Sequence, residues 1–594
     1  MARRVLNGIS VSTGIAIGRA YFINRSYRAK LPRREIAPII VDSEIERLQR
    51  AFDAVKAELT ASRENMPEEL REHQLIIDSY LLMLEDPKLR KASCENIQKR
   101  SINAEWALEE AVLDLEKAFS ALDNEYIRER IQDVELVFNH VLAELMGKQE
   151  DLSCIEGRVI ILAHDLTPAD TVKLEISRIM AFATIQGGKT SHTGILARTL
   201  TIPAIVGVER LEEQVDDGEL IVIDGITGHI VVGPSEEELE AYFKKQVQFE
   251  TYQRKIIREC NLPAETKDGH SVQVVANIEL IEEVTSVLDY GGEGVGLYRT
   301  EYSYMNRDDL PTEDELAETY TDLASILEPR KTVFRTLDLG ADKFVSSYGR
   351  LNEANPAMGL RAIRFCLRHR DMFREQIRAI LRASPYGDVC IMFPMISGLQ
   401  ELRQAKQVLF QCMKELKAEG HPFNPDIPVG IMVELPAAVM VAEFLAEEVD
   451  FFSIGTNDLI QYSLGIDRTN HHVSYLYQPL HPAIVRAIKH VVDAGHQAGI
   501  EVSLCGEVAS DPYCVPILMG MDIDCLSLSP QAIPGIKRII RQTTMEDCKT
   551  LLREVIKCRT VPRINSLVRK SIFTESPEEL AFYTSLLDSD ELGG

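Results

Sequence analysis

Residues 429–458 read VGIMVELPAAVMVAEFLAEEVDFFSIGTND, and this stretch shows the pattern that decides the fold of the larger part of the chain. Two short apolar runs, VGIMV and FFSIG, stand on either side of a segment of helical character. Six further apolar runs lie beyond Pro263: VQVVANI, GVGLY, TVFRTL, VCIMFP, EVSL and CLSLS. Nearly all of the eight runs are separated from one another by helical segments. Eight such units over residues 263–575 predict a (β/α)8 barrel.

The predicted strands end in side chains that can do chemistry. In barrels of this type the functional residues lie at the C-terminal ends of the strands. A purely structural barrel would not need arginines, carboxylates, amides and a thiol at these ends. The strand-end residues are Asn277, Arg299, Arg335, Glu434, Asn457, Asp458 and Cys505.

Arg299 and Arg335 end two of the runs, and two guanidinium groups that converge on one barrel mouth can bind a phosphate through paired hydrogen bonds. The alternative is that each arginine pairs with a nearby acid, such as Glu301 or Asp338. One arginine alone would favour the ion pair, whereas two at strand ends favour phosphate. Two further arginines could join the site: Arg361 and Arg468.

Glu434 and Asp458 are carboxylates at two different strand ends. Hard oxygen ligands from separate strands suit Mg²⁺, which takes one or two carboxylates together with water and substrate oxygens. Taken alone, Asp458 would more often cap a helix, because NDL can open one, and Glu434 would be an ordinary acid. Together with the arginines they predict a site for an anion that carries both a phosphate and a carboxylate.

Cys505 lies in EVSLCGEVASD at the seventh strand end. A lone cysteine is more often a small buried hydrophobic residue than a catalyst. Its position at the barrel mouth favours a proton donor.

A histidine upstream of the barrel lies in the loop GGKTSHTGILAR, residues 187–198. The glycines allow close approach of a ligand to the backbone, and the pattern after His192 predicts a helix whose N-terminus favours phosphate. A lone loop histidine is usually a surface or capping residue. A neutral imidazole is, however, a capable nucleophile near pH 7, and a phosphate-binding barrel in the same chain implies phosphate transfer between the two.

The rest of the chain divides by its pattern. Residues 25–147 are mostly helical, whereas residues 148–234 contain short apolar runs between turn signals and predict an α/β unit. The opening ISVSTGIAIGRAYFI, within residues 1–24, indicates a short strand pair. A charged, proline-free stretch predicts a linker helix over residues 235–262, and residues 576–594 form a C-terminal tail.

Composition argues against several classes of function. The net charge of −27 disfavours non-specific nucleic-acid binding, which depends on basic patches. No apolar run approaches the roughly 18 residues of a membrane span, and the start MARRVLNGIS lacks the apolar stretch of a signal peptide. Eleven scattered cysteines without a CxxC pair suggest free thiols in a reducing cytosol. We therefore expect a cytoplasmic protein without a membrane or nucleic-acid partner.

Eight stretches in order carry a family resemblance: GGKTSHTGILARTLTIPAIVG, GVGLYRTEYSYMNRDDLPTEDE, RTLDLGADK, NPAMGLRAIR, VGIMVELPAA, SIGTNDLIQY, DRTN and LCGEVASDP. On these motifs, and over nearly its whole length, the chain resembles the Enzyme I family of the bacterial phosphoenolpyruvate-dependent sugar phosphotransferase system. The resemblance implies an α/β multidomain fold. A helical docking unit is inserted in a swivelling α/β phosphohistidine domain made of residues 1–24 and 148–234, and the barrel follows.

The resemblance also implies the chemistry. The phosphoryl group of phosphoenolpyruvate passes to His192 and then to a histidine phosphocarrier protein, pyruvate is released, and the transfer begins sugar uptake or a regulatory phosphorelay. The resemblance implies that Glu434 and Asp458 bind Mg²⁺ and that Cys505 protonates the enolate carbon. It also implies a homodimer that forms through the barrel. Recognition of phosphoenolpyruvate is implied for Arg299, Arg335, Asn457 and Arg468, with Arg361 close by.

The chain departs from the family pattern in several places. Lys189 stands where the family usually has arginine, and Ala341 where it usually has glycine. In the helical unit, which docks the carrier in the family, Tyr80 replaces a usual histidine, and Glu135 and Leu136 replace arginine and aspartate. Because Glu135 reverses a charge, we expect these helical positions to retune carrier choice and to leave phosphorylation of the histidine untouched.

Two other interpretations stay open. A dikinase-like phosphoenolpyruvate or pyruvate enzyme would share the histidine unit and the barrel, but it would also need a large nucleotide-binding domain. The chain has no P-loop motif, and Ser191 stands where that group usually has cysteine. A partner-binding regulator that has lost turnover would not need His192 and the intact barrel-mouth residues.

Overall fold

The computed structural model forms two compact units, Met1–Glu250 and Thr251–Gly594. The residues that the structure describes are 3–23, 31–64, 80–81, 83–84, 87–120, 137–147, 157–164, 178–187, 197, 202–304, 309–339, 355–467, 470 and 473–575. Several residues singled out in the sequence lie outside these ranges: Glu135, Leu136, Lys189, Ser191, His192, Ala341, Arg468 and the tail 576–594.

The second unit is a closed barrel of eight parallel strands. Each strand pairs with the next one along the chain, and the last pairs with the first. Short apolar runs that are buried on both faces are typical of parallel strands, and the predicted (β/α)8 barrel is confirmed. The strands are β9 (Gln273–Ile278), β10 (Val295–Arg299), β11 (Lys331–Arg335), β12 (Asp388–Phe393), β13 (Val429–Val433), β14 (Phe451–Gly455), β15 (Glu501–Cys505) and β16 (Cys525–Leu528).

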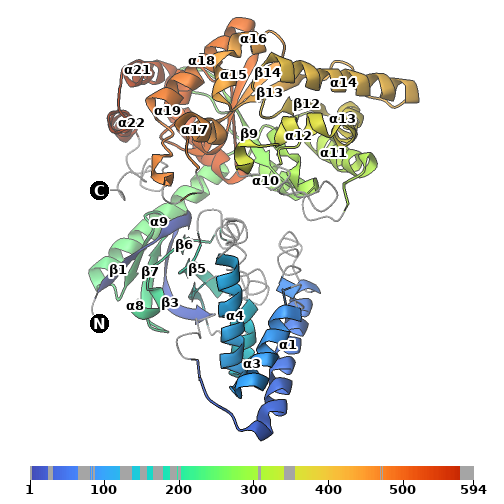
Figure 1. The fold of residues 1–594 in the computed structure, drawn as a ribbon. Helices are drawn as coiled ribbons and strands as arrows, with labels where there is room; N and C mark the ends of the chain where they lie inside the picture. Colours follow the sequence, from blue (N-terminus) through green and yellow to red (C-terminus); the bar gives the residue numbers. More distant parts are fainter. Residues whose placement is uncertain are drawn as a thin grey trace. The chain divides into compact units, whose positions relative to one another are not determined.

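Helices follow the strands and surround the barrel (Figure 1). Their apolar faces pack on the strands in one large core that includes Phe334, Phe373 and Phe393. The α-helices are α10 (Val284–Asp289), α11 (Glu313–Leu327), α12 (Ala362–Arg368), α13 (Arg370–Ala383), α14 (Leu399–Glu419), α15 (Pro436–Met440), α16 (Ala442–Ala446), α17 (Thr456–Leu464), α18 (Pro482–Ala498), α19 (Val515–Gly520), α20 (Ile533–Gln542), α21 (Met545–Val555) and α22 (Val561–Glu575). Short 3-10 helices span Ile281–Glu283, Thr300–Tyr304, Pro356–Met358, Ser384–Tyr386, Ser474–Leu476, Glu507–Ser510 and Pro530–Ala532.

The two ends of the barrel interior differ. Lys331 and Glu501, the first residues of β11 and β15, form an ion pair of 2.7 Å at the N-terminal end. These strands lie on opposite sides of the barrel, so the pair crosses its interior. Above it lies an apolar cluster of Leu297, Val333, Cys390, Met392, Met432, Phe451 and Cys505. The filled interior leaves the C-terminal rim as the place for a ligand.

The first unit contains a sheet with the strand order β1-β8-β7-β3-β4-β5-β6-β2 (Figure 1). Strands from the first 23 residues and from residues 159–232 therefore share one sheet. The strand pair expected near the N-terminus is wrong in one respect, because β2 pairs with β6 whereas β3 lies between β4 and β7. The elements are β1 (Arg4–Asn7), β2 (Ile9–Ser12), β3 (Ile15–Ile23), β4 (Val159–Ala163), β5 (Ile179–Thr184), β6 (Ala204–Val206), α8 (Leu211–Gln214), β7 (Leu220–Asp224) and β8 (His229–Val232).

Helices α1 (Val41–Glu64), α3 (Pro87–Arg100) and α4 (Ala104–Ser120) enclose a separate core. A 3-10 helix, Pro38–Ile40, precedes α1. The helical spacing of the sequence is visible in this core, where α1 contributes Leu48, Phe52, Val55 and Leu59.

Tyr80 belongs to the same core, and only 2% of it is exposed. A side chain this deeply buried cannot contact a carrier directly. Burial therefore contradicts a direct contact between Tyr80 and a carrier, and packing explains the aromatic ring at this position; any effect of Tyr80 on carrier choice would have to act through the core. Glu135 and Leu136 lie outside the described residues, so the expectation for them stays a prediction.

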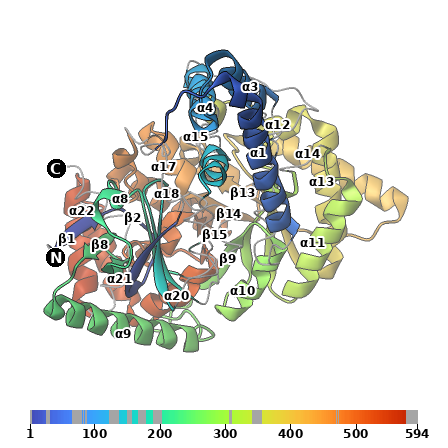
Figure 2. The ribbon, with the colours of Figure 1, turned by 90° about the horizontal axis from the view of Figure 1, so that it is seen from below.

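The charged stretch before the barrel forms α9 (Glu236–Arg258), one continuous helix (Figure 2). Lys245 on this helix pairs with Asp224, at the end of β7, at 2.7 Å. Like every other helix among the described residues, α9 offers no stretch long and apolar enough to cross a membrane.

Candidate active site

The C-terminal rim of the barrel gathers residues from separate strands. Arg299, Arg335 and Cys505 are the last residues of β10, β11 and β15. Glu434 directly follows β13, and Asp458 lies in the first turn of α17, which follows β14. Because the parallel strands of a closed barrel end at one rim, the fold brings these residues to one end of the barrel.

Arg335 is buried between two carboxylates. Its Nη2 donates to Glu301 Oε1 at 2.7 Å, and its Nη1 pairs with Asp338 Oδ2 at 3.0 Å. The acid pairing that the sequence left open therefore holds for this arginine, and both expected acids bind it. Burial lowers the pKa of Arg335, but the carboxylates of Glu301, Asp338 and Glu434 outweigh burial and raise it, which keeps the guanidinium charged.

One donor of Arg335 remains available. Its Nε is buried and makes no hydrogen bond within the part of the chain that the structure describes. A buried N–H without an acceptor costs roughly 1–3 kcal/mol. An acceptor that reaches this group would remove that cost.

Arg361 reaches the same carboxylate from the start of α12. Its Nη2 and Nε donate to Asp338 Oδ1 at 2.7 and 3.2 Å. Its Nη1 donates to the hydroxyl of Tyr462 at 3.2 Å, and its Nη2 lies 3.6 Å from Asp458 Oδ2. Asp338 therefore connects two of the arginines that the sequence assigned to the site.

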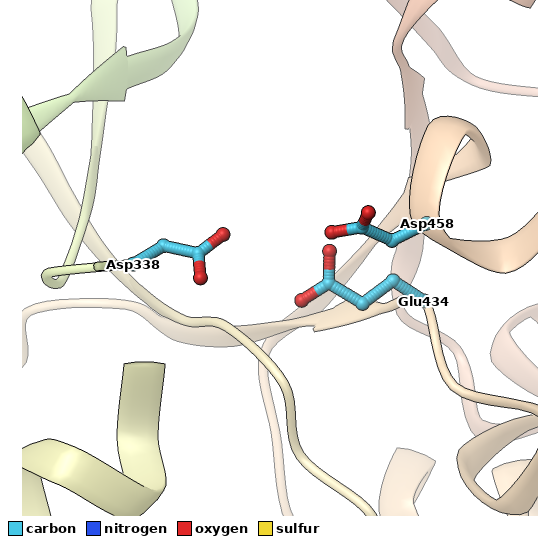
Figure 3. Close-up of side chains that lie close together, drawn as sticks. All are labelled: Asp338, Glu434 and Asp458. Carbon is cyan, nitrogen blue, oxygen red and sulfur yellow. The ribbon is translucent and has the colours of Figure 1, made fainter. Parts of the chain in front are cut away.

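Three carboxylates, from Asp338, Glu434 and Asp458, point toward a common space (Figure 3). One oxygen from each lies within 4.8 Å of the others. Burial raises the pKa of Glu434 well above its ordinary value, and the charges of Asp458 and Asp338 raise it further, whereas Arg335 opposes them. Like charges this close need a proton or a cation between them. Within the described residues, this group of carboxylates is the candidate cation site.

A strained turn holds Glu434. The backbone N–H of Met395 donates to Glu434 Oε1 at 2.6 Å. Met395 has a φ of +55°, in the left-handed region that costs a non-glycine residue about 1–2 kcal/mol. Gly455 leaves room for the other oxygen, because a Cβ at that position would lie 2.9 Å from Glu434 Oε2. Both contacts fix the direction of the carboxylate.

Cys505 is almost fully buried beside the carboxylates. The Ser453 hydroxyl donates to its Sγ at 3.5 Å, and the thiol donates to the Ile454 carbonyl at 3.5 Å. Burial raises the pKa of the Cys505 thiol, so the group is protonated at neutral pH. The next residue, Gly506, has a φ of +101°, and a Cβ there would collide with Thr456 Oγ1. The glycine of the LCG motif is therefore required.

Arg299 and Asn457 lie at the rim with other partners. Arg299 pairs with Glu279, an acid that the sequence did not single out. Asn457 Oδ1 accepts from the Tyr477 hydroxyl at 3.3 Å and from the Glu507 N–H at 3.1 Å. These contacts orient the amide and do not use its NH₂ group.

The residues that hold the arginine-bearing strand ends were not identified from the sequence. Gln376 on α13 is fully buried, donates to Thr300 Oγ1 at 2.9 Å and accepts from the Leu337 N–H at 3.0 Å. The Thr300 hydroxyl donates to the Arg335 carbonyl at 2.9 Å. A glutamine on the apolar face of a helix is the signal that could have revealed this network, because buried amides are almost always hydrogen-bonded.

One described residue of the predicted set, Asn277, is not part of this cluster. Asn277 bonds to Ser527 on the neighbouring strand and has a structural role. His192 and Arg468 lie outside the described residues. Just before the histidine loop, β5 ends and Gly187 adopts a φ of +115°, a conformation that favours glycine.

The described rim residues combine three chemical abilities. Guanidinium groups bind phosphate oxygens, a close group of carboxylates holds a cation, and a protonated thiol can give up a proton. This combination suits a small phosphorylated substrate whose remainder must be protonated after the phosphate leaves.

Three family models match successive parts of the chain. Residues 7–130 match the N-terminal model of PEP-utilising enzymes, and residues 155–228 match their mobile domain. Residues 253–545, which contain the barrel strands, match their PEP-binding domain.

Known proteins are similar to the chain over nearly their full length. The phosphoenolpyruvate-protein phosphotransferase of Priestia megaterium is 41% identical over 568 residues, which cover 95% of this chain and 99% of the relative. The protein of that name from Geobacillus stearothermophilus is 42% identical, with 96% and 98% covered. The one from Staphylococcus aureus (strain MSSA476) is 38% identical, with 96% and 100% covered.

Proposed function

The chain belongs to the family of phosphoenolpyruvate-protein phosphotransferases, and from this premise we propose that His192 accepts the phosphoryl group of phosphoenolpyruvate and passes it to a histidine phosphocarrier protein. In the first step the bond between the enol oxygen and phosphorus breaks, and a bond from phosphorus to an imidazole nitrogen forms. The enolate that remains takes up a proton at carbon and leaves as pyruvate. In the second step the phosphoryl group moves to the carrier, which begins sugar uptake or a regulatory relay.

The observation that carries the proposal is the arginine cluster at the barrel rim. Arg335 holds a buried Nε donor that has no acceptor among the described residues, beside the guanidinium of Arg361. In phosphoryl transfer, positioning and charge stabilisation supply most of the catalysis, and fixed guanidinium groups supply both. Arg299 and Asn457 at the same rim, together with Arg468, complete the proposed binding set.

The donor set of Glu434 and Asp458 fits Mg²⁺. Both offer hard oxygen ligands from separate strand ends, and their closeness supports a cation between them, since it would relieve the repulsion between the carboxylates. When bound, Mg²⁺ supplies positive charge to the phosphate and carboxylate oxygens of the substrate. The protein's part is to hold the two carboxylates at a fixed separation.

Cys505 is proposed as the acid that protonates the enolate carbon. The thiol carries its proton at neutral pH because burial raises its pKa, and it lies at the end of β15 on the same rim. After transfer the thiolate regains a proton from solvent. A positioned acid of this kind typically contributes about 10²- to 10⁴-fold to the rate.

The histidine must meet both the barrel and the carrier. We propose that the α/β sheet carries His192 between the barrel rim and the helical unit by rigid-body rotation about its linkers. Its separate hydrophobic clusters support this, because a unit with its own core can move as one body.

The barrel is also proposed to form a homodimer. Four large apolar side chains are exposed on segments that follow barrel strands: Met358, Met440, Phe444 and Tyr475, at 60, 79, 59 and 62%. Large exposed apolar side chains are candidates for burial at a subunit interface. Sedimentation of a Met440→Glu/Phe444→Glu variant tests this, with a shift from dimer to monomer expected.

We further propose that the relay operates in the cytoplasm. Every cysteine in the described part of the chain is a free thiol, which suits a reducing compartment.

A burst experiment tests the function. The purified chain is mixed with phosphoenolpyruvate and Mg²⁺ without any nucleotide, and pyruvate is measured. One pyruvate per chain is expected, followed by steady release when a carrier is added. A requirement for nucleotide would favour a dikinase-like enzyme, and no pyruvate under any condition would favour a regulator without turnover.

A further inference from the structure

Asp338 is the carboxylate of the rim whose role is open. It is the third member of the group that contains Glu434 and Asp458, and by geometry alone it could be a third cation ligand. It follows β11 by three residues, and its side chain is only 4% exposed. The choice between a ligand and another role depends on what its two oxygens already bind.

Both oxygens of Asp338 are bound by arginine. Oδ1 accepts from Arg361 Nη2 at 2.7 Å and Nε at 3.2 Å, and Oδ2 lies 3.0 Å from Arg335 Nη1. One oxygen of this carboxylate accepts two donors from one guanidinium, and the other oxygen faces a second guanidinium. Little capacity for a metal ion is left. Glu434, by contrast, uses only Oε1 for the Met395 N–H, and that contact leaves Oε2 for a cation.

We propose that Asp338 is a positioning residue, which sets the two guanidinium groups at the angle that the transferring phosphoryl group needs, and is not a third metal ligand. The proposal rests on the proposed function, because it assigns the two arginines to the phosphate of the substrate. Long arginine side chains lose much rotational freedom when they are held in one geometry, and a carboxylate placed between them fixes both before the substrate arrives.

The structure holds Asp338 itself in place. Its backbone N–H donates to Glu301 Oε1 at 3.0 Å, and the same oxygen accepts from Arg335 Nη2. The preceding residue, Leu337, donates its N–H to Gln376. A side chain whose backbone is held by two successive hydrogen bonds can act as a template for its neighbours.

The substitution Asp338→Asn separates the two roles. It keeps both arginine charges near the phosphate, so attraction of phosphoenolpyruvate persists, but it puts an amide donor against a guanidinium. We expect kcat for pyruvate formation to fall about 10²-fold, as for other small misplacements, with KM changed less than about 3-fold. Asp388→Asn, the same change at the first residue of β12 on the opposite end of the barrel, is the matched control and should leave both values unchanged.

Metal binding is measured separately, with Mn²⁺ and electron paramagnetic resonance on protein without substrate. Loss of a nearby charge alone should weaken Mn²⁺ binding of Asp338→Asn by less than about 5-fold. Asp458→Asn, which loses a proposed ligand, should weaken it about 100-fold. Equal weakening in the two variants would overturn the positioning role, and so would an unchanged kcat in Asp338→Asn.

A second variant covers the case in which Asp338→Asn does not fold. Glu301→Gln touches Arg335 and the Asp338 N–H but none of the three carboxylates of the cation group. This variant should also show a lower kcat with little change in KM, and its Mn²⁺ affinity should equal that of the wild type. A parallel loss of Mn²⁺ affinity would contradict the proposal. Failure of the proposed function looks different, because the wild-type chain would then form no pyruvate, while the Mn²⁺ comparison would still decide whether Asp338 is a ligand.

Discussion

The side-chain amide of Gln376 donates a 2.9 Å hydrogen bond to the hydroxyl of Thr300, and through it α13 is joined to the strand end that carries Arg299. The same amide accepts from the Leu337 N–H, beside Asp338. One buried glutamine thus ties together the segments after β10 and β11. This link fixes the spacing between the arginines of the rim.

Replacement of Gln376 by leucine should lower the stability of the barrel. The change keeps the side-chain volume but leaves the Leu337 N–H without an acceptor and removes the donor to the Thr300 hydroxyl, at a cost of about 1–3 kcal/mol. Urea unfolding followed by circular dichroism measures the loss. Gln407→Leu, on the exposed side of α14, is the control and should stay within about 0.5 kcal/mol of wild type. Equal stability of the two variants would show that the amide network does not hold the rim.

Asp458→Asn should raise the Mg²⁺ concentration that supports half-maximal pyruvate formation. The reason is the loss of one of two carboxylates that face each other within 4.8 Å. An Mg²⁺ titration of the initial rate gives the value, and an increase of about 100-fold is expected. A titration that matches wild type would remove Asp458 from the proposed ligands.

Cys505→Ser should slow pyruvate formation about 10²- to 10⁴-fold and weaken substrate binding far less, because a serine hydroxyl is a poor acid at neutral pH. The pH profile gives an independent check. Since burial raises the pKa of this thiol, its acid form persists through the ordinary thiol pKa of about 8.5 and is lost only above it. The wild-type rate should therefore stay level through that pH and fall at higher pH. A decline that begins below pH 8 would exclude a thiol with a raised pKa.

Tyr80→His should destabilise the helical unit and should not improve transfer to a conventional carrier. The substitution puts a polar ring into the core formed by α1, α3 and α4. Hydrogen exchange in α1 should accelerate, whereas Tyr386→His, at a half-exposed position in the second unit, should leave it unchanged. Faster transfer to a conventional carrier with normal exchange in α1 would restore Tyr80 to a docking role.

The sequence predicts the barrel and the rim for one physical reason. Parallel strands end together, so apolar runs that finish in Arg335, Glu434 or Cys505 place these side chains at one mouth whatever lies between them. The sequence pattern can therefore identify residues at or directly after a strand end. The structure brings these residues together at the barrel rim, as the pattern predicts.

The remaining contacts depend on three-dimensional neighbours that a local pattern does not encode. Arg299 pairs with Glu279 from the adjacent strand end, although Glu301 is nearer in sequence. β2 and β3 look like a hairpin because they are close in sequence, yet they pair with different strands. A family pattern identifies Tyr80 as a departure but carries no information about its burial.

The central claim is that His192 is the residue that carries the phosphoryl group, and mapping of the phosphorylated residue tests it most directly. The wild-type chain and His192→Ala are each incubated with labelled phosphoenolpyruvate and Mg²⁺, and bound label and phosphoenolpyruvate affinity are measured. The wild type should carry acid-labile, alkali-stable label on the peptide that contains His192. His192→Ala should carry none, yet bind phosphoenolpyruvate with unchanged affinity, because the binding residues belong to the barrel. Label that persists in His192→Ala would contradict the account, and loss of phosphoenolpyruvate binding in that variant would contradict the division of labour between the histidine and the barrel.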